Sequence, residues 1–219
     1  NGFFHEDKQD SIWHYYFPTG ELSYIAHFKD GLKSGEWSYF YPNGANYRKG
    51  NYRNDERDGN WQTWYEDGVL LMNGNYTHGL EQGTWYNYWE NGALKNKAAF
   101  KDGLMNGPWI SYTPENVMSL SGKYKKGFKV GTWESYYNNG RLKEKANYKI
   151  FTEQNVTSDM AIMGLKETVS DYHGKFEAYS QKDFSLKCEG KYYKGMKHGQ
   201  WIDYYPGGVV PTIISEYRY

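Results

Sequence analysis

The sequence predicts an all-β protein, an elongated single-layer array of about eight stacked antiparallel β-hairpins that form a curved sheet. Three observations lead to this prediction. A Gly-x-Trp motif returns at intervals of 24 residues, each interval reads as two strands separated by turns, and aromatic residues fill the same positions in every copy. A unit this short cannot bury a core alone, so the copies must stack on one another.

The motif marks the start of the first strand in each copy. In the first copy Ser replaces Gly, and in the seventh Phe replaces Trp. The copies are Ser11-Ile12-Trp13, Gly35-Glu36-Trp37, Gly59-Asn60-Trp61, Gly83-Thr84-Trp85, Gly107-Pro108-Trp109, Gly131-Thr132-Trp133, Gly174-Lys175-Phe176 and Gly199-Gln200-Trp201.

The second copy shows how one unit is built. Its first strand, Trp37–Tyr41, consists of residues with strong β propensity. Pro42-Asn43-Gly44 then predicts a turn, because Pro presets φ and Gly accepts the left-handed conformation. A second strand runs from Tyr47 to Arg53, and Asn54-Asp55 forms the turn into the next copy. No window predicts a helix.

Alternation along the first strand places the Trp column on one face, where we expect it to form the structural core. The paired strand carries a small residue in the corresponding place, and Gly inside a strand needs a reason. We expect a neighbouring indole to lie flat over this bare backbone. The residues assigned to this structural role are Trp37, Trp61, Trp85, Trp109, Trp133, Trp201, Gly50, Gly74, Gly122 and Gly190.

A second aromatic column follows three residues after each Trp and is expected to point to the opposite face. Aromatic platforms of this kind serve as core, as protein contacts or as sugar-binding surfaces. Together with two Met of a central insertion, six of these rings are the candidate binding residues: Tyr16, Phe40, Trp64, Tyr88, Tyr112, Tyr136, Met160 and Met163.

The repeats are interrupted once. Residues 1–150 hold repeats one to six, residues 151–172 are a non-repeat insertion, and residues 173–219 hold repeats seven and eight, all in one continuous repeat domain. The apolar centre of the insertion, Met160–Leu165, either packs on the sheet to cover an irregular joint or forms a partner-binding loop.

Composition argues against several functions. Lys plus Arg and Asp plus Glu both number 26, so no global field attracts nucleic acid, and no nucleic-acid partner is expected. No apolar run approaches the ~18 residues of a membrane-spanning helix. The six His are scattered, Cys188 is the only cysteine, and no nucleophile–base pair is recognisable. We expect no enzyme activity, metal or cofactor.

The stretch from Tyr124 to Gly140, Tyr-Lys-Lys-Gly-Phe-Lys-Val-Gly-Thr-Trp-Glu-Ser-Tyr-Tyr-Asn-Asn-Gly, resembles a MORN repeat of the bacterial variant type. Similar stretches run from Phe28 to Gly44 and from Tyr192 to Gly208. The resemblance implies an array of β-hairpins that serves in binding, scaffolding or dimerisation and carries no catalytic residues. Proteins with this variant repeat include an antitoxin-like family, and some MORN arrays are proposed to touch phospholipids.

We therefore expect a non-catalytic protein-interaction or scaffolding module that presents a curved aromatic surface. The end strands near Asp10–Phe17 and Thr212–Tyr217 are expected to have unpaired edges, so self-association through the array ends is a further expectation. An antitoxin or immunity protein that neutralises a toxin partner is one alternative. A surface module for a glycan or a lipid headgroup is another. An extracytoplasmic location is favoured over the cytoplasm.

Overall fold

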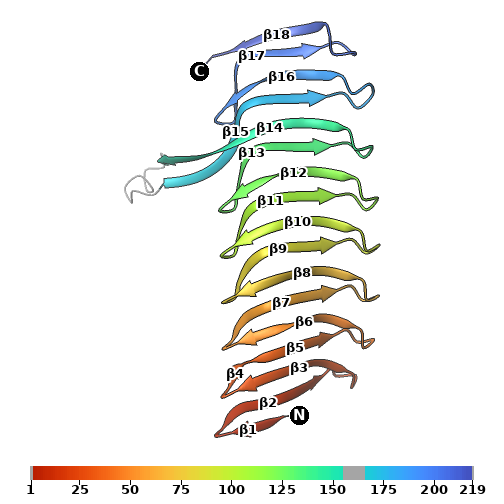
Figure 1. Ribbon diagram of the computed structural model, residues 1–219, viewed down its shortest axis with the longest axis vertical. Coiled ribbons are helices and arrows are strands. Elements are labelled where there is room, and N and C mark those ends of the chain that lie inside the picture. The colour runs from red at the N-terminus through yellow and green to blue at the C-terminus, as the bar shows by residue number, and fades with distance from the viewer. Residues whose placement is uncertain (1, 155–165, 219) are drawn as a thin grey trace. The chain divides into compact units, whose positions relative to one another are not determined.

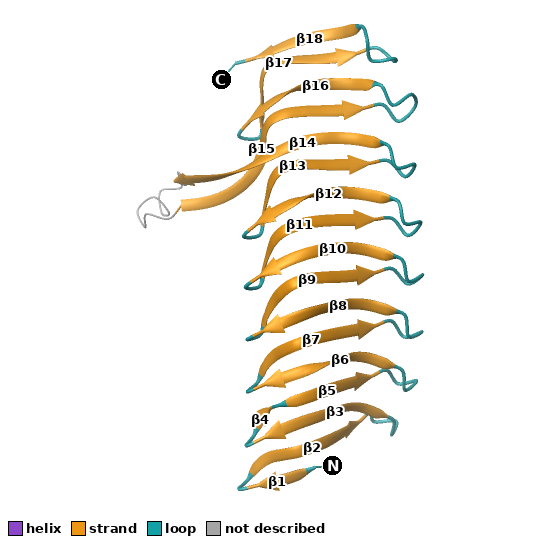
Figure 2. Ribbon diagram, in the orientation of Figure 1, coloured by secondary structure: helices purple, strands orange, loops and turns teal. Residues whose placement is uncertain are grey.

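The computed structural model describes residues 2–154 and 166–218, which form 18 β-strands and no helix (Figures 1 and 2). The chain divides into two compact units, Asn1–Leu104 with Pro114–Asn116, and Met105–Thr113 with Val117–Tyr219. In each unit, strands that follow one another in sequence pair antiparallel. The predicted all-β fold of consecutive hairpins is confirmed.

The first unit contains ten strands, of which the fourth and the fifth are separated only by Ser34 and both pair with the third. They are β1 (Phe3–His5), β2 (Lys8–Tyr16), β3 (Leu22–Lys29), β4 (Leu32–Lys33), β5 (Gly35–Phe40), β6 (Asn46–Arg53), β7 (Glu56–Trp64), β8 (Leu70–Thr77), β9 (Leu80–Tyr88) and β10 (Leu94–Lys101).

The second unit contains eight strands with the same hairpin order. They are β11 (Leu104–Tyr112), β12 (Met118–Lys125), β13 (Phe128–Tyr136), β14 (Leu142–Gln154), β15 (Lys166–Tyr179), β16 (Leu186–Tyr193), β17 (Met196–Tyr204) and β18 (Pro211–Tyr217).

The prediction of two unpaired edge strands is wrong in part. The sequence predicted an unpaired edge along Asp10–Phe17, but β1 pairs with the beginning of β2, with Phe3 opposite Asp10 and His5 opposite Lys8. This extra strand has no Gly-x-Trp motif, which is why the repeat pattern did not reveal it. At the other end, β18 pairs with β17, and no other described strand pairs with it.

The described part of the insertion is not a loop but an extension of two strands. β14 and β15 have 13 and 14 residues and stay paired as far as Gln154 opposite Lys166. Figure 1 shows this hairpin reaching beyond the ends of the other strands of its unit. Met160 and Met163 lie outside the described residues.

In four repeats the indole lies over the bare backbone of a glycine in the hairpin before it. A Cβ added to Gly50, Gly74, Gly122 or Gly190 would lie 2.1–2.3 Å from Cδ2 of the Trp on the following strand. The contact predicted from the sequence is therefore present. The four indoles involved, Trp61, Trp85, Trp133 and Trp201, are 2%, 4%, 3% and 2% exposed. Trp37 is equally buried at 4%, whereas Trp109 is half-buried.

A break in strand register makes room for the ring. Lys49 pairs with Gln62 and Asn51 pairs with Asp58, so residues 59–61 bulge opposite Gly50 alone. Gly59 accommodates the bulge with a φ of +73°. Since the Trp61 Nε1–H donates to the Asn51 carbonyl at 3.0 Å, the indole is oriented as well as buried. Trp37, Trp133 and Trp201 make the equivalent bond ten residues back, at 2.9–3.2 Å.

Within each unit, the indoles alternate edge-to-face with the rings of the paired strands. In the first unit the centroids from Trp37 through Tyr52, Trp61, Tyr76 and Trp85 are 4.9–6.1 Å apart. In the second unit Tyr124 lies 5.9 Å from Trp109 and 5.0 Å from Trp133. Such T-shaped pairs contribute about 0.5–1.5 kcal/mol each beyond their buried area. This ring ladder is the core of each single-layer sheet.

We predict that Gly74→Ala destabilises the protein by roughly 1–3 kcal/mol through overpacking against Trp85. Ala is otherwise compatible with an extended backbone and would lower the entropy of the unfolded chain, so a loss of stability reports the indole contact. Urea unfolding measures the difference. Gly68→Asn is the matched control, because nothing lies within 4 Å of its missing Cβ and Asn tolerates its φ of +88°. A Gly74→Ala variant as stable as the parent would contradict the stacking.

Candidate functional site

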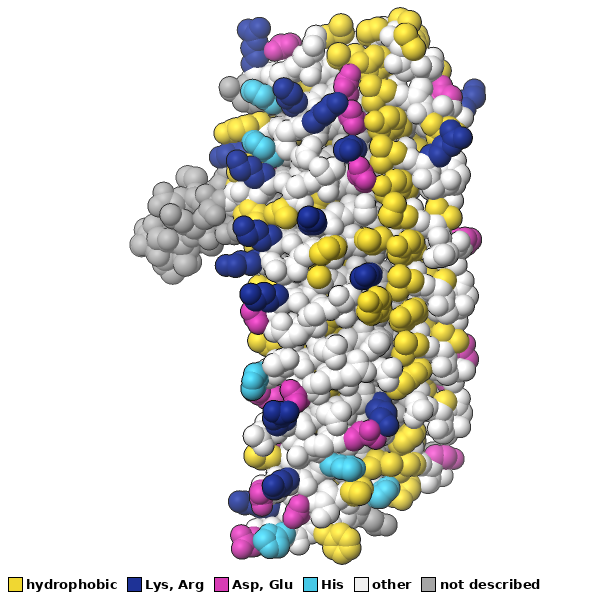
Figure 3. Space-filling model, viewed as in Figure 1, with side chains coloured by type: hydrophobic (Ala, Val, Ile, Leu, Met, Phe, Trp, Pro, Cys, Tyr) yellow, Lys and Arg dark blue, Asp and Glu magenta, His cyan; other side chains and the backbone are white. Residues whose placement is uncertain are grey.

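The second aromatic column lies on the face of the sheet opposite the Trp column. We call this face the second face, and the face that carries the Trp column the first face. Hydrogen bonds establish this placement in the second unit: Tyr136 Oη donates to Glu134 two residues before it, and Tyr204 Oη donates to Glu189, both at 2.7 Å. Tyr16 is 53% exposed and the other rings of the column are half-buried. Figure 3 shows hydrophobic side chains gathered in a band across the strands of each unit. The column is therefore accessible to a partner. Its described members are Tyr16, Phe40, Trp64 and Tyr88 in the first unit, and Tyr112, Tyr136, Tyr179 and Tyr204 in the second.

The polar neighbours of this column are amides and ion pairs. In the first unit, Asn60 Nδ2 donates to Asn73 Oδ1 at 2.6 Å, and Lys49 Nζ lies 2.9 Å from a Glu36 carboxylate oxygen. In the second unit, Lys145 Nζ lies 3.0 Å from a Glu134 carboxylate oxygen. The Tyr136 hydroxyl and Lys145 together lower the pKa of Glu134.

On the first face, Lys and Arg side chains lie over the buried indoles. Four side chains, each four residues before a buried indole, place an ammonium or guanidinium group 4.3–5.0 Å from its centroid. Such contacts contribute about 0.5–1 kcal/mol at exposed sites. They also cover the ring ladder, so this face presents positive charge rather than bare rings. The four are Lys33, Arg57, Lys129 and Lys197.

A further aromatic column in the turns was missed by the sequence analysis. The Tyr41 hydroxyl donates to the Trp64 carbonyl at 2.9 Å, and the Tyr65 hydroxyl donates to the Tyr88 carbonyl at 3.0 Å. Each bond ties one turn to the next hairpin, 23 residues later. The signal was an aromatic residue directly after six of the eight rings of the second face, at Phe17, Tyr41, Tyr65, Trp89, Tyr137 and Tyr205.

Two turns of the second unit are enlarged. In earlier copies the turn closes with an N–H to carbonyl bond four residues on, as from Tyr137 to Arg141 at 2.9 Å. The turns that begin at Ser180 and Tyr205 close five residues on, at Ser185 and Val210. Each therefore contains one extra residue.

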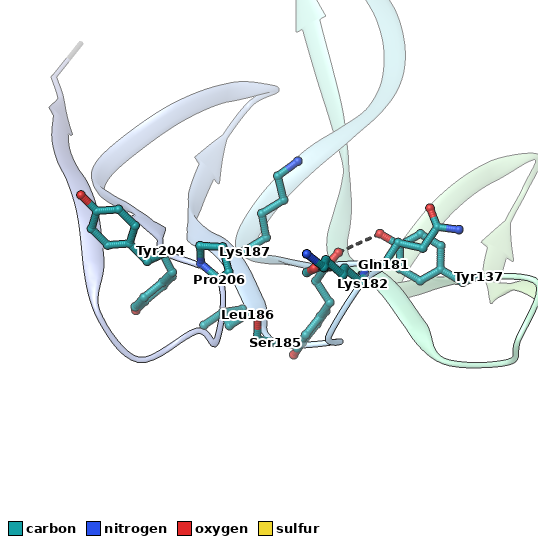
Figure 4. A pocket seen from close by; sticks show the side chains of 11 residues that line it. Tyr137, Gln181, Lys182, Ser185, Leu186, Lys187, Tyr204 and Pro206 are labelled. Carbon is teal, nitrogen blue, oxygen red and sulfur yellow. Dashed lines mark hydrogen bonds between the residues drawn. The ribbon is translucent and has the colours of Figure 1, made fainter.

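These turns line the open pocket drawn in Figure 4, about 490 Å³ in volume. Tyr204 and Pro206 stand on one side of it, and Tyr137 and Gln181 on the other. The lining residues are Tyr137, Tyr179, Ser180, Gln181, Lys182, Ser185, Leu186, Lys187, Tyr204, Tyr205 and Pro206. A pocket of about 500 Å³ in the first unit is lined by Tyr65, Trp89, Glu90, Asn91, Lys95 and Pro114.

Little reactive chemistry is present in the part of the chain that the structure describes. No group of three or more His, Cys, Asp or Glu there is placed to hold a metal ion. His78 Nδ1 lies 3.3 Å from a Glu56 carboxylate oxygen in an exposed pair. Burial raises the pKa of the half-buried Cys188 thiol, the opposite of nucleophile activation. None of the described segments is a helix long and apolar enough to cross a membrane.

Comparison with protein families finds one family that matches part of the chain. The family described as the MORN repeat variant matches residues 33–54, 57–78, 81–102 and 129–149. Each matched segment covers one hairpin, namely β5–β6, β7–β8, β9–β10 and most of β13–β14, so these four hairpins are similar to the MORN repeat variant. The resemblance inferred from the sequence is confirmed for these segments. No curated protein sequence matches the chain.

We predict that Asp183→Asn loosens the enlarged turns. The Asp183 carboxylate accepts hydrogen bonds from Ser185 Oγ at 2.8 Å and from the Gly207 amide at 2.9 Å. Hydrogen bonds from the Ser180 and Ser185 side chains lower the pKa of Asp183 to about 2. Because this value is below the ordinary pKa of about 3.9, the stabilisation is present above pH 4 and is lost as the pH falls through about 2.

Thermal melts between pH 7 and pH 2 test this prediction. The variant should melt below the parent at pH 7, and the difference should vanish toward pH 2. Asp67→Asn is the control, because the Asp67 carboxylate accepts only a local bond from the Val69 amide, at 3.0 Å. Equal melting of the parent and Asp183→Asn at every pH would contradict the role of the carboxylate.

Proposed function

We propose that the chain is a non-catalytic protein-interaction module whose second face docks a protein partner. The single observation that carries this proposal is the partly accessible ring column of that face. The same slot holds an aromatic residue in all eight sequence copies, and its described members are exposed or half-buried.

The energetics of interfaces support a protein partner. Tyr and Trp dominate protein-binding hot spots, because they offer large contact area and lose little side-chain entropy. The ring ladder of the first face already supplies the core in each unit. The second column is therefore available for contact while the fold rests on the first.

The match to MORN-variant repeats supports the same class of function, since arrays of stacked repeats present extended binding surfaces.

We predict that removing rings from the second face weakens partner binding. The tagged full chain is used to capture partners from its native host, and mass spectrometry identifies them. The affinity of the purified partner is then measured by calorimetry for the parent, for Tyr16→Ser and for Tyr88→Ser. We expect a loss of roughly tenfold or more for at least one ring variant, equivalent to about 1.4 kcal/mol.

Leu32→Ser and Leu80→Ser are matched controls, because these side chains are apolar and 42% and 46% exposed but lie at the opposite turns. They should bind within about twofold of the parent. Thermal melts establish that each variant is folded. If the ring variants bind as the parent does, or if the Leu variants lose equal affinity, the second face is not the docking surface.

A further inference from the structure

The pocket between the enlarged turns departs from the repeat. In a regular copy the turn that follows the second-face ring is short and closes on itself. Here two successive turns each gain a residue and line a pocket of about 490 Å³. Its volume is close to that of the pocket at the regular turns of the first unit, about 500 Å³, so the lining residues are what distinguish it. This volume lies within the range of roughly 300–1,000 Å³ that small-ligand pockets occupy.

Three contacts hold the pocket walls in place. The Tyr137 hydroxyl donates to the Tyr179 carbonyl at 2.8 Å, the bond drawn in Figure 4. The Arg141 guanidinium lies 4.0 Å from the Phe184 centroid and joins the same two turns. Asp183 connects the two enlarged turns through the Gly207 amide. A binding site held in this way needs little ordering when a ligand arrives.

The charged side chains that line the pocket are all positive. Lys182 and Lys187 line it, and none of its lining residues is acidic. Both lysines are exposed, and neither forms an ion pair with a described carboxylate. The nearby Asp183 carboxylate is ionised and offsets one of the two lysines, which leaves an excess of one positive charge, and its oxygens already accept bonds from Ser185 and Gly207. The pocket therefore favours an anion.

The remaining lining indicates what kind of anion fits. Tyr137, Tyr179 and Tyr204 supply ring surface, and the Gln181 amide supplies both a donor and an acceptor. Aromatic rings beside amides and ammonium groups suit a ligand with an apolar ring face, several hydroxyls and a negative charge.

We propose that this pocket binds a carboxylated sugar, such as a uronic or sialic acid residue of a glycan. The sugar ring lies against the Tyr side chains, its carboxylate lies near Lys182 and Lys187, and its hydroxyls bond to Gln181. The site shares Tyr179 and Tyr204 with the second face, but it adds the turn residues Gln181, Lys182 and Lys187, and its test needs no protein partner.

The pocket suits a sugar better than an acidic peptide. Peptide anchors are bulky apolar side chains that require dry, fully desolvated pockets. Here Leu186 and Pro206 are the only aliphatic lining residues, and Gln181, Lys182 and Lys187 are open to solvent. A hydrated ligand that keeps its polar groups partly in water fits these surroundings.

The test uses the full chain with two carboxylated probes, trigalacturonic acid and sialyllactose, each beside its neutral methyl ester. Calorimetry at low salt should show at least one acid binding roughly tenfold or more tightly than its ester, and its affinity should fall as salt is added. The double variant Lys182→Gln/Lys187→Gln should lose that preference and melt as the parent does. Gln181→Ala should weaken binding of the acid and the ester alike.

Lys125→Gln/Lys149→Gln is the matched control, because it removes two exposed lysines of the same unit outside the pocket. It should bind within about twofold of the parent. The proposal is overturned if neither acid binds or if acid and ester bind equally. Unchanged affinity of the Lys182/Lys187 variant, equal loss in the control, or binding of poly-glutamate as tight as that of the acids would also overturn it.

Discussion

The contact between an indole and the bare backbone of the preceding hairpin is the constraint on which each unit depends. A single-layer sheet has no second layer to cover its apolar face, so the core must be built from side chains that lie nearly flat on the sheet. Trp61 over Gly50 and Trp85 over Gly74 meet this need, since a Cβ at either Gly would overlap the ring. Losing a Trp from such a site costs roughly 3–5 kcal/mol.

The same contact explains why other features recur. The indole reaches the glycine only because residues 59–61 bulge opposite Gly50, and the bulge requires the left-handed φ of Gly59. The indole N–H is then placed to bond the Asn51 carbonyl. Gly, Trp and the opposing small residue therefore form one geometric unit. Ala26, Ala98 and Ala146 take the small-residue slot in other copies and are at most 2% exposed, so the slot requires a small side chain everywhere.

Sequence analysis recovered the parts of the structure that repeat and missed those that depart from the repeat. The hairpins, the Trp column and its glycine partners followed from period and alternation, which are local rules. β1 was missed because Phe3–His5 carries no motif. The paired extension of β14 and β15 was missed because the cross-strand partners of an insertion cannot be read from a single chain. The lining of the second-unit pocket was missed because each enlarged turn adds only one residue and because contacts such as Asp183 to Gly207 join residues 24 positions apart.

Turn length is the property that this architecture can vary at least cost to the fold. Surface turns contribute little to the ring ladder, and each added residue increases loop-closure entropy only slightly. Arg141 over Phe184 and the Asp183 carboxylate stabilise the enlarged turns without touching a buried indole. A pocket can therefore arise in one pair of copies while the stacking of Trp133 and Trp201 on their glycines is retained. For this reason, departures from the repeat, rather than the repeat itself, are where ligand-specific chemistry is expected in each unit.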